Sequence, residues 1–183
     1  QPSNDLLCGA TPITVGAGCN SINGDNTGAS QEPNEPMPSC FFGTSNSVWF
    51  EFQAPSTGWV RLSTNNTFGT HPDTELALYA LNGNNCTQLD SLVPLACAQD
   101  DGGGIKPFHS TLNQVAVIPG RTYYVSVSGW NQSEGSFCLS VDSISSPVSI
   151  PSNDSLCQAT IVNLDAGCQL GAIGSYQNAN FEV

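Results

Sequence analysis

The amino-acid sequence predicts an all-β fold: a two-sheet β-sandwich held by disulfide bonds and followed by the start of a second repeat. Three observations support this prediction. Helical periodicity is almost absent, apolar and polar residues alternate in short runs, and turn-forming residues separate those runs. The chain also carries eight cysteines in 183 residues, which suits a fold with covalent cross-links.

Five runs alternate in the manner of half-buried strands. Each is bounded by turn-forming residues such as Pro119-Gly120, and about eight or nine short strands of this kind indicate two packed sheets. Trp49 alternates against Val48 and Phe50, so we expect another part of the chain to cover the face on which it lies. The five runs are 48–52, 59–63, 75–79, 123–127 and 137–141.

The beginning of the chain recurs 149 residues later. Pro2-Ser3-Asn4-Asp5 returns as Pro151-Ser152-Asn153-Asp154, and Ala17-Gly18-Cys19 returns as Ala166-Gly167-Cys168 at the same offset. We therefore expect a complete β-sandwich module over 1–142, a Ser/Pro linker over 143–152, and the N-terminal fragment of a second copy over 153–183.

The cysteines are expected to form disulfides in an oxidising, extracellular setting, because their number is even and no CxxC pair is present. Local closure favours Cys8 with Cys19, Cys86 with Cys97 and Cys157 with Cys168, which all lie eleven residues apart, and leaves Cys40 with Cys138. Six cysteines in the first module allow fifteen pairings, so other connectivities stay open.

The chain is strongly acidic, with a net charge of −12, because only Arg61, Lys106 and Arg121 oppose fifteen acidic residues. Such a surface repels nucleic acid and anionic lipid, so we expect no nucleic-acid partner. No apolar run approaches the roughly twenty residues of a membrane span, so we expect no membrane insertion. The acidic excess either maintains solubility or attracts cations.

Two acidic segments carry oxygen ligands on flexible loops, as a Ca²⁺ site requires. One contains Asp73, and the other is Asp100-Asp101 before three glycines; Glu35 in a proline-rich loop is a further candidate. The alternative is that these residues only form turns and solvated loops.

Exposed aromatic side chains are the candidates for ligand binding. Trp59 alternates with Val60 and Leu62 and should point outward, while Trp130, beside two amide residues, shares a region with Tyr124. Such residues suit sugar stacking or a protein contact, or they merely cover sheet edges. No Gly-x-Ser-x-Gly or HExxH motif occurs, and we expect no enzymatic activity.

Several motifs follow one another along the chain. In order, they are Asn4-Asp5-Leu6-Leu7-Cys8-Gly9-Ala10, Ser47-Val48-Trp49-Phe50-Glu51-Phe52, Asp73-Thr74, Leu76-Ala77-Leu78-Tyr79, Asp100-Asp101, Pro119-Gly120, Thr122-Tyr123-Tyr124-Val125, and Gly135 with Phe137. Together they resemble the bacterial pre-peptidase C-terminal (PPC)-type domain, in the CUB-like form repeated in secreted and cell-surface proteins of Bacteroidetes-like bacteria. The resemblance implies a jelly-roll type of sandwich, export, an accessory role, and calcium ligands at Asp73, Asp100 and Asp101.

The resulting functional prediction is a non-catalytic, calcium-stabilised repeat of a large secreted or cell-surface bacterial protein, which acts in adhesion or in the assembly of a surface filament. Its partner would be an extracellular polysaccharide, a protein surface, or neighbouring repeats of the same chain. One alternative is a carbohydrate-binding or targeting appendage of a secreted hydrolase, and another is a purely structural spacer.

Overall fold

The described residues form an all-β fold, as the sequence predicts. The computed structural model describes residues 1–41, 46–83, 85–103 and 105–146, and Gln1–Ser145 forms one compact unit. Its helical elements are single 3₁₀ turns at η1 (Leu7–Gly9), η2 (Leu89–Ser91) and η3 (Trp130–Gln132). The predicted second repeat, with Cys157 and Cys168, lies outside the described residues, and the predicted domain boundaries stay predictions.

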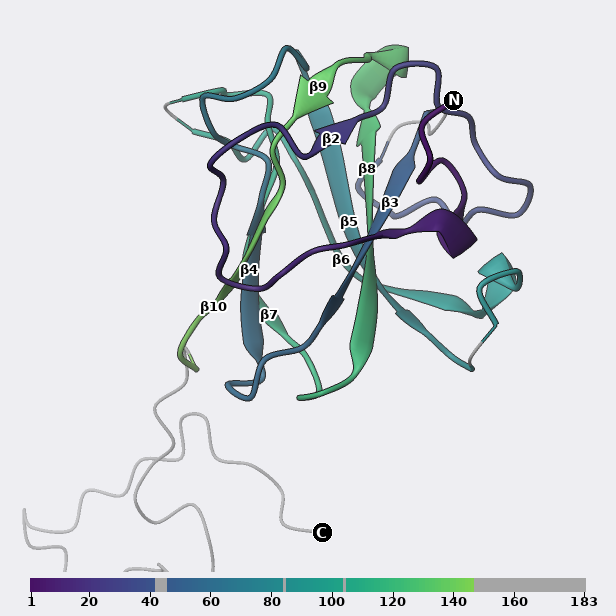
Figure 1. The fold of residues 1–183 in the computed structure, drawn as a ribbon, viewed down its shortest axis with the longest axis vertical. Coiled ribbons are helices and arrows are strands. Elements are labelled where there is room, and N and C mark those ends of the chain that lie inside the picture. Colours follow the sequence, from purple (N-terminus) through teal and green to yellow (C-terminus); the bar gives the residue numbers. More distant parts are fainter. Residues whose placement is uncertain (42–45, 84, 104, 147–183) are drawn as a thin grey trace, which may run out of the picture. The chain divides into compact units, whose positions relative to one another are not determined.

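The largest sheet has five strands in the order β1-β3-β8-β5-β6 (Figure 1). Strand β1 runs parallel to β3, and the other pairs are antiparallel. Phe50 of β3 and Leu78 of β5 both lie opposite Val125 of β8, so the centre of the sheet is apolar. The strands are β1 (Thr11–Pro12), β3 (Val48–Gln53), β8 (Thr122–Gly129), β5 (Thr74–Leu81) and β6 (Leu92–Gln99).

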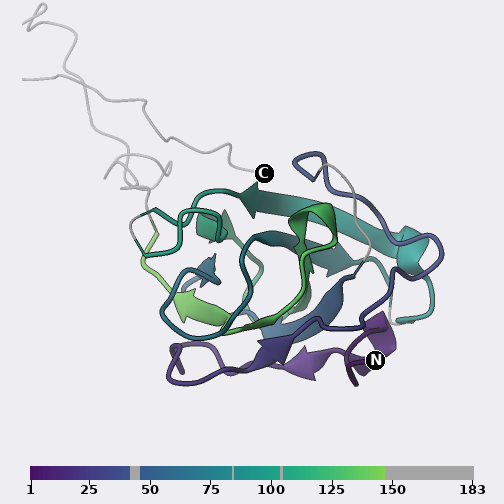
Figure 2. The same cartoon turned by 90° about the horizontal axis from the view of Figure 1, so that it is seen from above.

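A three-stranded sheet, β10-β4-β7, and a two-stranded sheet, β2-β9, complete the fold. The predicted strand over 137–141 is two strands, because β9 pairs with β2 whereas β10 pairs with β4. Figure 2 shows from above the loops that connect the strands at one end. These strands are β10 (Ser140–Ser143), β4 (Trp59–Ser63), β7 (Thr111–Ala116), β2 (Gly24–Asp25) and β9 (Ser136–Phe137).

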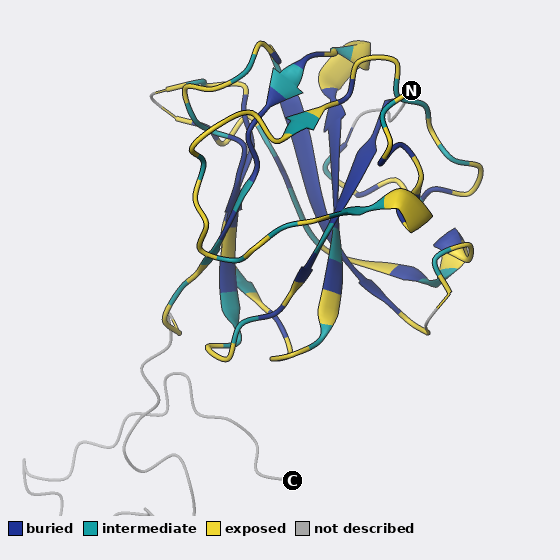
Figure 3. Cartoon of the chain, in the orientation of Figure 1, coloured by how far each residue is buried: buried dark blue, intermediate teal, exposed yellow. Residues whose placement is uncertain are grey.

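The main core joins residues of the five-stranded and three-stranded sheets in one cluster. Phe50 and Leu78 contribute from the larger sheet, and Val60 and Leu62 from the smaller one, and all four are fully buried. Figure 3 shows that the buried residues follow the strands while exposed residues concentrate in the loops. Removal of this apolar surface from water is the main force that holds the sheets together.

The opposite face of the five-stranded sheet is also buried. Trp49 and Tyr79 lie on it with ring centroids 5.4 Å apart, and neither side chain is exposed. Leu7 and Phe41 pack on them from two segments, 1–10 and 32–41, which we call the covering segments. The expectation that another part of the chain covers Trp49 is confirmed.

Two disulfides bind the covering segments to the β5–β6 region of the sheet, Cys8 to Cys86 and Cys40 to Cys97. The pairings favoured by local closure, Cys8–Cys19, Cys86–Cys97 and Cys40–Cys138, are therefore wrong. The eleven-residue spacing is misleading because it does not show which distant segment lies beside each cysteine. Strand β6 carries Cys97 along the sheet and away from Cys86, which precedes the strand.

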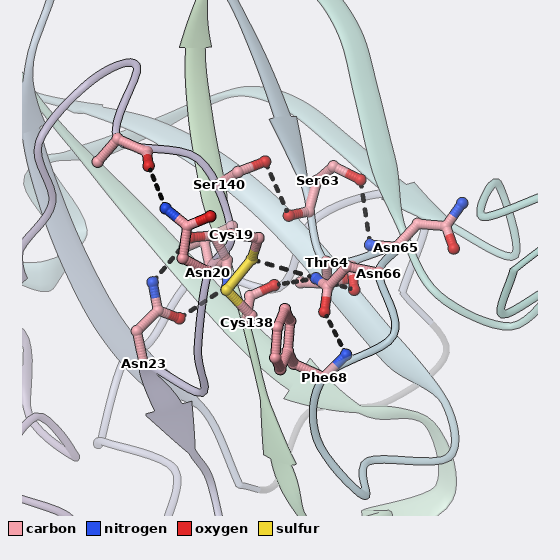
Figure 4. The surroundings of a disulfide bond; sticks show 12 residues. Cys19, Asn20, Asn23, Ser63, Thr64, Asn65, Asn66, Phe68, Cys138 and Ser140 are labelled. Carbon is pink, nitrogen blue, oxygen red and sulfur yellow. Dashed lines mark hydrogen bonds between the residues drawn. A yellow bond between two sulfur atoms is a disulfide. The ribbon is translucent and has the colours of Figure 1, made fainter.

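The third disulfide, Cys19 to Cys138, attaches the segment before β2 to the junction of β9 and β10 (Figure 4). Asn66 reinforces it, because its Nδ2 donates to the Cys138 carbonyl over 2.6 Å and to the Thr64 carbonyl over 3.0 Å. On the other side, Asn23 exchanges two hydrogen bonds of 2.8 Å with the backbone of Leu139. The N-terminal third of the chain is thus tied to both sheets.

Removal of the Cys8–Cys86 bridge, by Cys8→Ala together with Cys86→Ala, should lower the free energy of unfolding. The bridge closes a sequence separation of 78 residues, which is worth about 4 kcal/mol in the chain-entropy model. Urea denaturation measures the loss. Proteolysis of the original protein without reduction should yield two peptides joined by the Cys8–Cys86 disulfide. Peptides joined by a Cys8–Cys19 disulfide would contradict the structure.

Candidate functional site

Three loops meet at the end of the molecule where β5 begins and β8 ends. We call residues 64–73, 100–103 with 105–110, and 129–135 the loop end. Lys106 Nζ joins the first two loops by donating to the carbonyls of Phe68 and Gly69 at 3.3 and 3.0 Å. The amide of Trp130 donates to the Asp73 carbonyl over 3.3 Å and joins the third. The loop end is therefore one connected surface.

A buried polar network forms the floor of the loop end. The ring of His109 is fully buried, and its Nδ1 and Nε2 lie 2.7 Å from the Thr64 carbonyl and 2.8 Å from the His71 carbonyl. The hydroxyls of Thr64 and Thr74 lie 2.7 Å apart, and both accept from the Ser110 amide. Buried polar groups that are bonded in this way specify a single loop arrangement.

His71 lies beside this network with its ring perpendicular to that of His109, at a centroid distance of 6.3 Å. Burial, followed by the proximity of His109 and Lys106, lowers the pKa of His71 to about 4. Its Nδ1 accepts from the Asp73 amide over 3.2 Å, which requires an unprotonated Nδ1. The neutral imidazole therefore orients the backbone at Asp73, and its role here is structural.

The third loop presents Trp130 on a fixed backbone. The buried side chains of Asn26 and Asn46 both donate to the Ser133 carbonyl, at 3.0 and 2.8 Å. Asn131 and Gln132 have positive φ angles of 51° and 64°, a conformation that non-glycine residues adopt only where the surroundings enforce it. Trp130 is 48% exposed, so a large apolar side chain is displayed on a loop whose backbone is held by hydrogen bonds.

Asp73 and Asp100 approach one another, because Asp73 directly precedes β5 and Asp100 directly follows its partner β6. Burial, and next the charge of Asp100, raise the pKa of the Asp73 carboxyl. Asp100 has a positive φ of 58°. A Cβ at Gly102 would lie 2.0 Å from the Lys106 carbonyl oxygen, so only glycine permits this loop closure. Asp101 is exposed on the same loop.

Glu35 does not join these aspartates and lies with the covering segments instead. Its Oε2 accepts from the Ser47 hydroxyl over 2.9 Å and from the Glu32 amide over 3.1 Å. Burial, together with the charges of Glu32 and Asp5, raises the pKa of Glu35 to about 7. The two hydrogen bonds lower the pKa, but by less than burial raises it. Of the four predicted metal ligands, Asp73 and Asp100 are close enough for their charges to interact, whereas Glu35 lies in another part of the fold.

The other predicted binding residues are separated from Trp130. Trp59 is half-buried on β4 of the three-stranded sheet, and Tyr124 is half-buried on β8 opposite Glu51. Burial, followed by the charge of Glu51, raises the pKa of Tyr124. Tyr124 lies near the beginning of β8, whereas Trp130 directly follows the end of that strand, so the two cannot form a single small binding site.

Across the part of the chain that the structure describes, three or more His, Cys, Asp or Glu side chains are nowhere gathered in a way that would hold a metal ion by themselves. A Ca²⁺ ion at Asp73 and Asp100 would need backbone carbonyls and water to complete its six to eight oxygen ligands. The helices among the described residues are single turns, and none has the length and apolarity that a membrane span requires.

Comparison with known proteins found no family model, no curated protein and no solved structure that matches this chain. Several residues that define the loop end escape sequence analysis. His71 and His109 are 38 positions apart, and Asn26 and Asn46 lie in irregular segments, so no periodicity or spacing marks them. The sequence signals for the loop end are the Asp-Asp-Gly loop, Asp73 and Trp130 with its amide neighbours.

Substitution Glu35→Gln should change how stability depends on pH. In the unfolded chain this carboxyl ionises near 4.5, whereas in the folded protein it ionises near 7. The stabilisation due to the neutral form is complete below the unfolded pKa and is lost as the pH rises through the folded pKa. The variant should therefore be more stable than the original at pH 8, by about 3 kcal/mol at most, and equal to it at pH 4.

Urea denaturation at both pH values measures this difference. The matched control is Glu134→Gln, which removes an exposed carboxylate instead of a buried one. A Glu35→Gln protein that is less stable than the original at pH 8 would contradict the assigned burial.

Proposed function

We propose that this chain is a non-catalytic extracellular repeat module of a large secreted or cell-surface bacterial protein, and that it acts in adhesion through the loop end. In this proposal the two packed sheets form a jelly-roll-like β-sandwich of the PPC type. Disulfides are typical of proteins outside the reducing cytosol, and the described residues contain three. This supports an extracellular location.

The observation that carries the proposal is the exposed side chain of Trp130 on a loop whose backbone is held by hydrogen bonds. Its loop is held by the buried Asn26 and Asn46, and it is connected through the Asp73 carbonyl to the acidic pair. An aromatic side chain that is presented rigidly loses little entropy on binding, which is why such residues dominate recognition surfaces. The exposed amides of Asn131 and Gln132 flank it as hydrogen-bonding groups.

Contacts made by the first copy support the proposed repeat. Asn4 Nδ2 donates to the Trp49 carbonyl over 2.9 Å, the Trp49 amide donates back over 2.8 Å, and the Asp5 carboxylate accepts from the Ser30 hydroxyl over 2.8 Å. The second copy keeps the same residue types at the positions that form these contacts. The position that differs corresponds to Leu6, which is 52% exposed. The retained residues are Asn153, Asp154, Leu156 and Cys157, and the replacement is Ser155.

A second candidate function is a carbohydrate-binding or targeting appendage of a secreted hydrolase. The observation that favours it is the combination of one exposed indole with amide neighbours at Trp130-Asn131-Gln132. Sugars bind to such surfaces by stacking their apolar ring face on the aromatic while amides bond to the hydroxyls. The two functions differ in ligand and share the same surface.

Calcium should stabilise the module if Asp73 and Asp100 hold it. A ligand that binds only the folded state raises the melting midpoint. At a ligand concentration one hundred times the dissociation constant, it adds about 2.7 kcal/mol to the free energy of unfolding. Differential scanning calorimetry in Ca²⁺ and in EDTA measures the shift. Asp73→Asn combined with Asp100→Asn should abolish it, and the exposed Asp90→Asn should not. An unchanged midpoint of the original protein in EDTA removes calcium from the proposal.

Binding to an array of glycans and bacterial surface proteins should depend on Trp130. We expect Trp130→Ala to weaken binding at least tenfold, about 1.4 kcal/mol, while its melting midpoint stays close to that of the original protein. Trp59→Ala is the matched control, since it removes an indole from another part of the fold. Binding that is lost with Trp59→Ala and retained with Trp130→Ala would refute the role of the loop end.

A further inference from the structure

Arg121 separates two cavities at the opposite end of β8 from Trp130. One cavity is polar and has a volume of about 380 Å³. The other is apolar, with a volume of about 320 Å³, and Leu95, Ile118 and Tyr123 are among its walls. The polar cavity is lined by Leu81, Gly83, Cys86, Arg121, Thr122 and Tyr124.

The turn before β8 fixes the backbone of Arg121. Pro119 and Gly120 occupy its centre, Gly120 has a positive φ of 76°, and the Arg121 amide donates to the Ile118 carbonyl over 3.2 Å. Proline followed by a left-handed glycine is typical of a type II turn. The Arg121 carbonyl also accepts from the Ala54 amide over 2.9 Å, so the residue is held from both sides.

The guanidinium of Arg121 is oriented as well. Its Nη2 donates to the Leu81 carbonyl over 2.9 Å, and its central carbon lies 5.6 Å from the centre of the Tyr123 ring. A guanidinium has five N–H donors in a planar fork. One bond to a carbonyl leaves donors for the polar cavity, and a neutral carbonyl leaves the positive charge uncompensated. A planar anion with two oxygen atoms would accept hydrogen bonds from the remaining N–H donors and would also neutralise the positive charge.

We propose that this polar cavity binds a carboxylated sugar, a uronic acid unit, with its carboxylate on Arg121. Thr122 and the backbone near Leu81 supply hydrogen-bonding groups for hydroxyls, and the ring of Tyr124 supplies an apolar wall. The volume is within the range of about 300–1,000 Å³ that small-ligand pockets occupy. An acidic peptide is the alternative ligand, and it is one outcome of the test below.

This second site is independent of the proposed adhesion surface. Strand β8 has eight residues, which at about 3.4 Å per residue place Arg121 more than 20 Å from Trp130. A ligand at one site therefore does not touch the other, and each can be removed by substitution alone.

Titration of the ¹⁵N-labelled protein with sodium D-glucuronate, followed by amide chemical shifts, tests the proposal. We expect the largest chemical-shift changes at Thr122, Tyr124 and Leu81. The expected dissociation constant is about 1 mM, which corresponds to a binding free energy of about −4 kcal/mol. D-glucose should bind at least tenfold more weakly, because it lacks the carboxylate. Raising the salt concentration should weaken glucuronate binding.

Arg121→Gln should weaken glucuronate binding at least tenfold. Arg61→Gln is the matched control, because it removes the same charge from an exposed position on β4, where Arg61 Nε bonds to Asn113. The melting midpoint of both variants checks that they fold, and Trp130→Ala should keep full glucuronate binding.

Three results would overturn the proposal. The first is no shift with glucuronate, and the second is equal binding of glucose. The third is binding of tri-glutamate that depends on Arg121 while glucuronate does not bind, which would assign the cavity to an acidic peptide.

Discussion

Both faces of the five-stranded sheet are apolar, and the need to cover both of them organises the rest of the structure. Phe50 and Val125 point to the face that packs on the smaller sheet, and Trp49 and Tyr79 point to the other. Irregular segments of the described residues cover the second face, and the disulfides at Cys8 and Cys40 hold them in place.

The sequence is most informative where residue types alternate along a short run. Strands 48–52, 59–63, 75–79 and 123–127 are predicted correctly from this alternation, although burial itself does not alternate in β5, which is buried throughout because both faces of its sheet are covered. The position of Trp49 even predicts a covered outer face, although it does not reveal which segment provides the cover. Strands β6 and β7 carry exposed apolar residues and weaker alternation, so the sequence defines them poorly.

Long-range pairing is where sequence reasoning fails, and the disulfides show why. Equal spacings of eleven residues suggest local bridges, but each of these cysteines pairs with a segment at least 57 positions away. The same limit applies to the sites. Asp73 and Asp100 can be predicted as neighbours from a hairpin, whereas a single arginine after Pro119-Gly120 gives no pattern, and only the fold shows the cavities on both of its sides.

The three basic residues form hydrogen bonds to neutral groups, so they do not neutralise the acidic residues of the surface. Lys106 bonds to two carbonyls, Arg61 to the Asn113 side chain, and Arg121 to the Leu81 carbonyl. Each of these contacts orients a positively charged side chain without neutralising its charge, and none of them involves a carboxylate. A chain with a net charge of −12 thus keeps its acidic pair available to a cation at one end of β8 and an oriented guanidinium available to an anion at the other. Because the two ends attract opposite charges, a single charged polymer cannot occupy both in the same way.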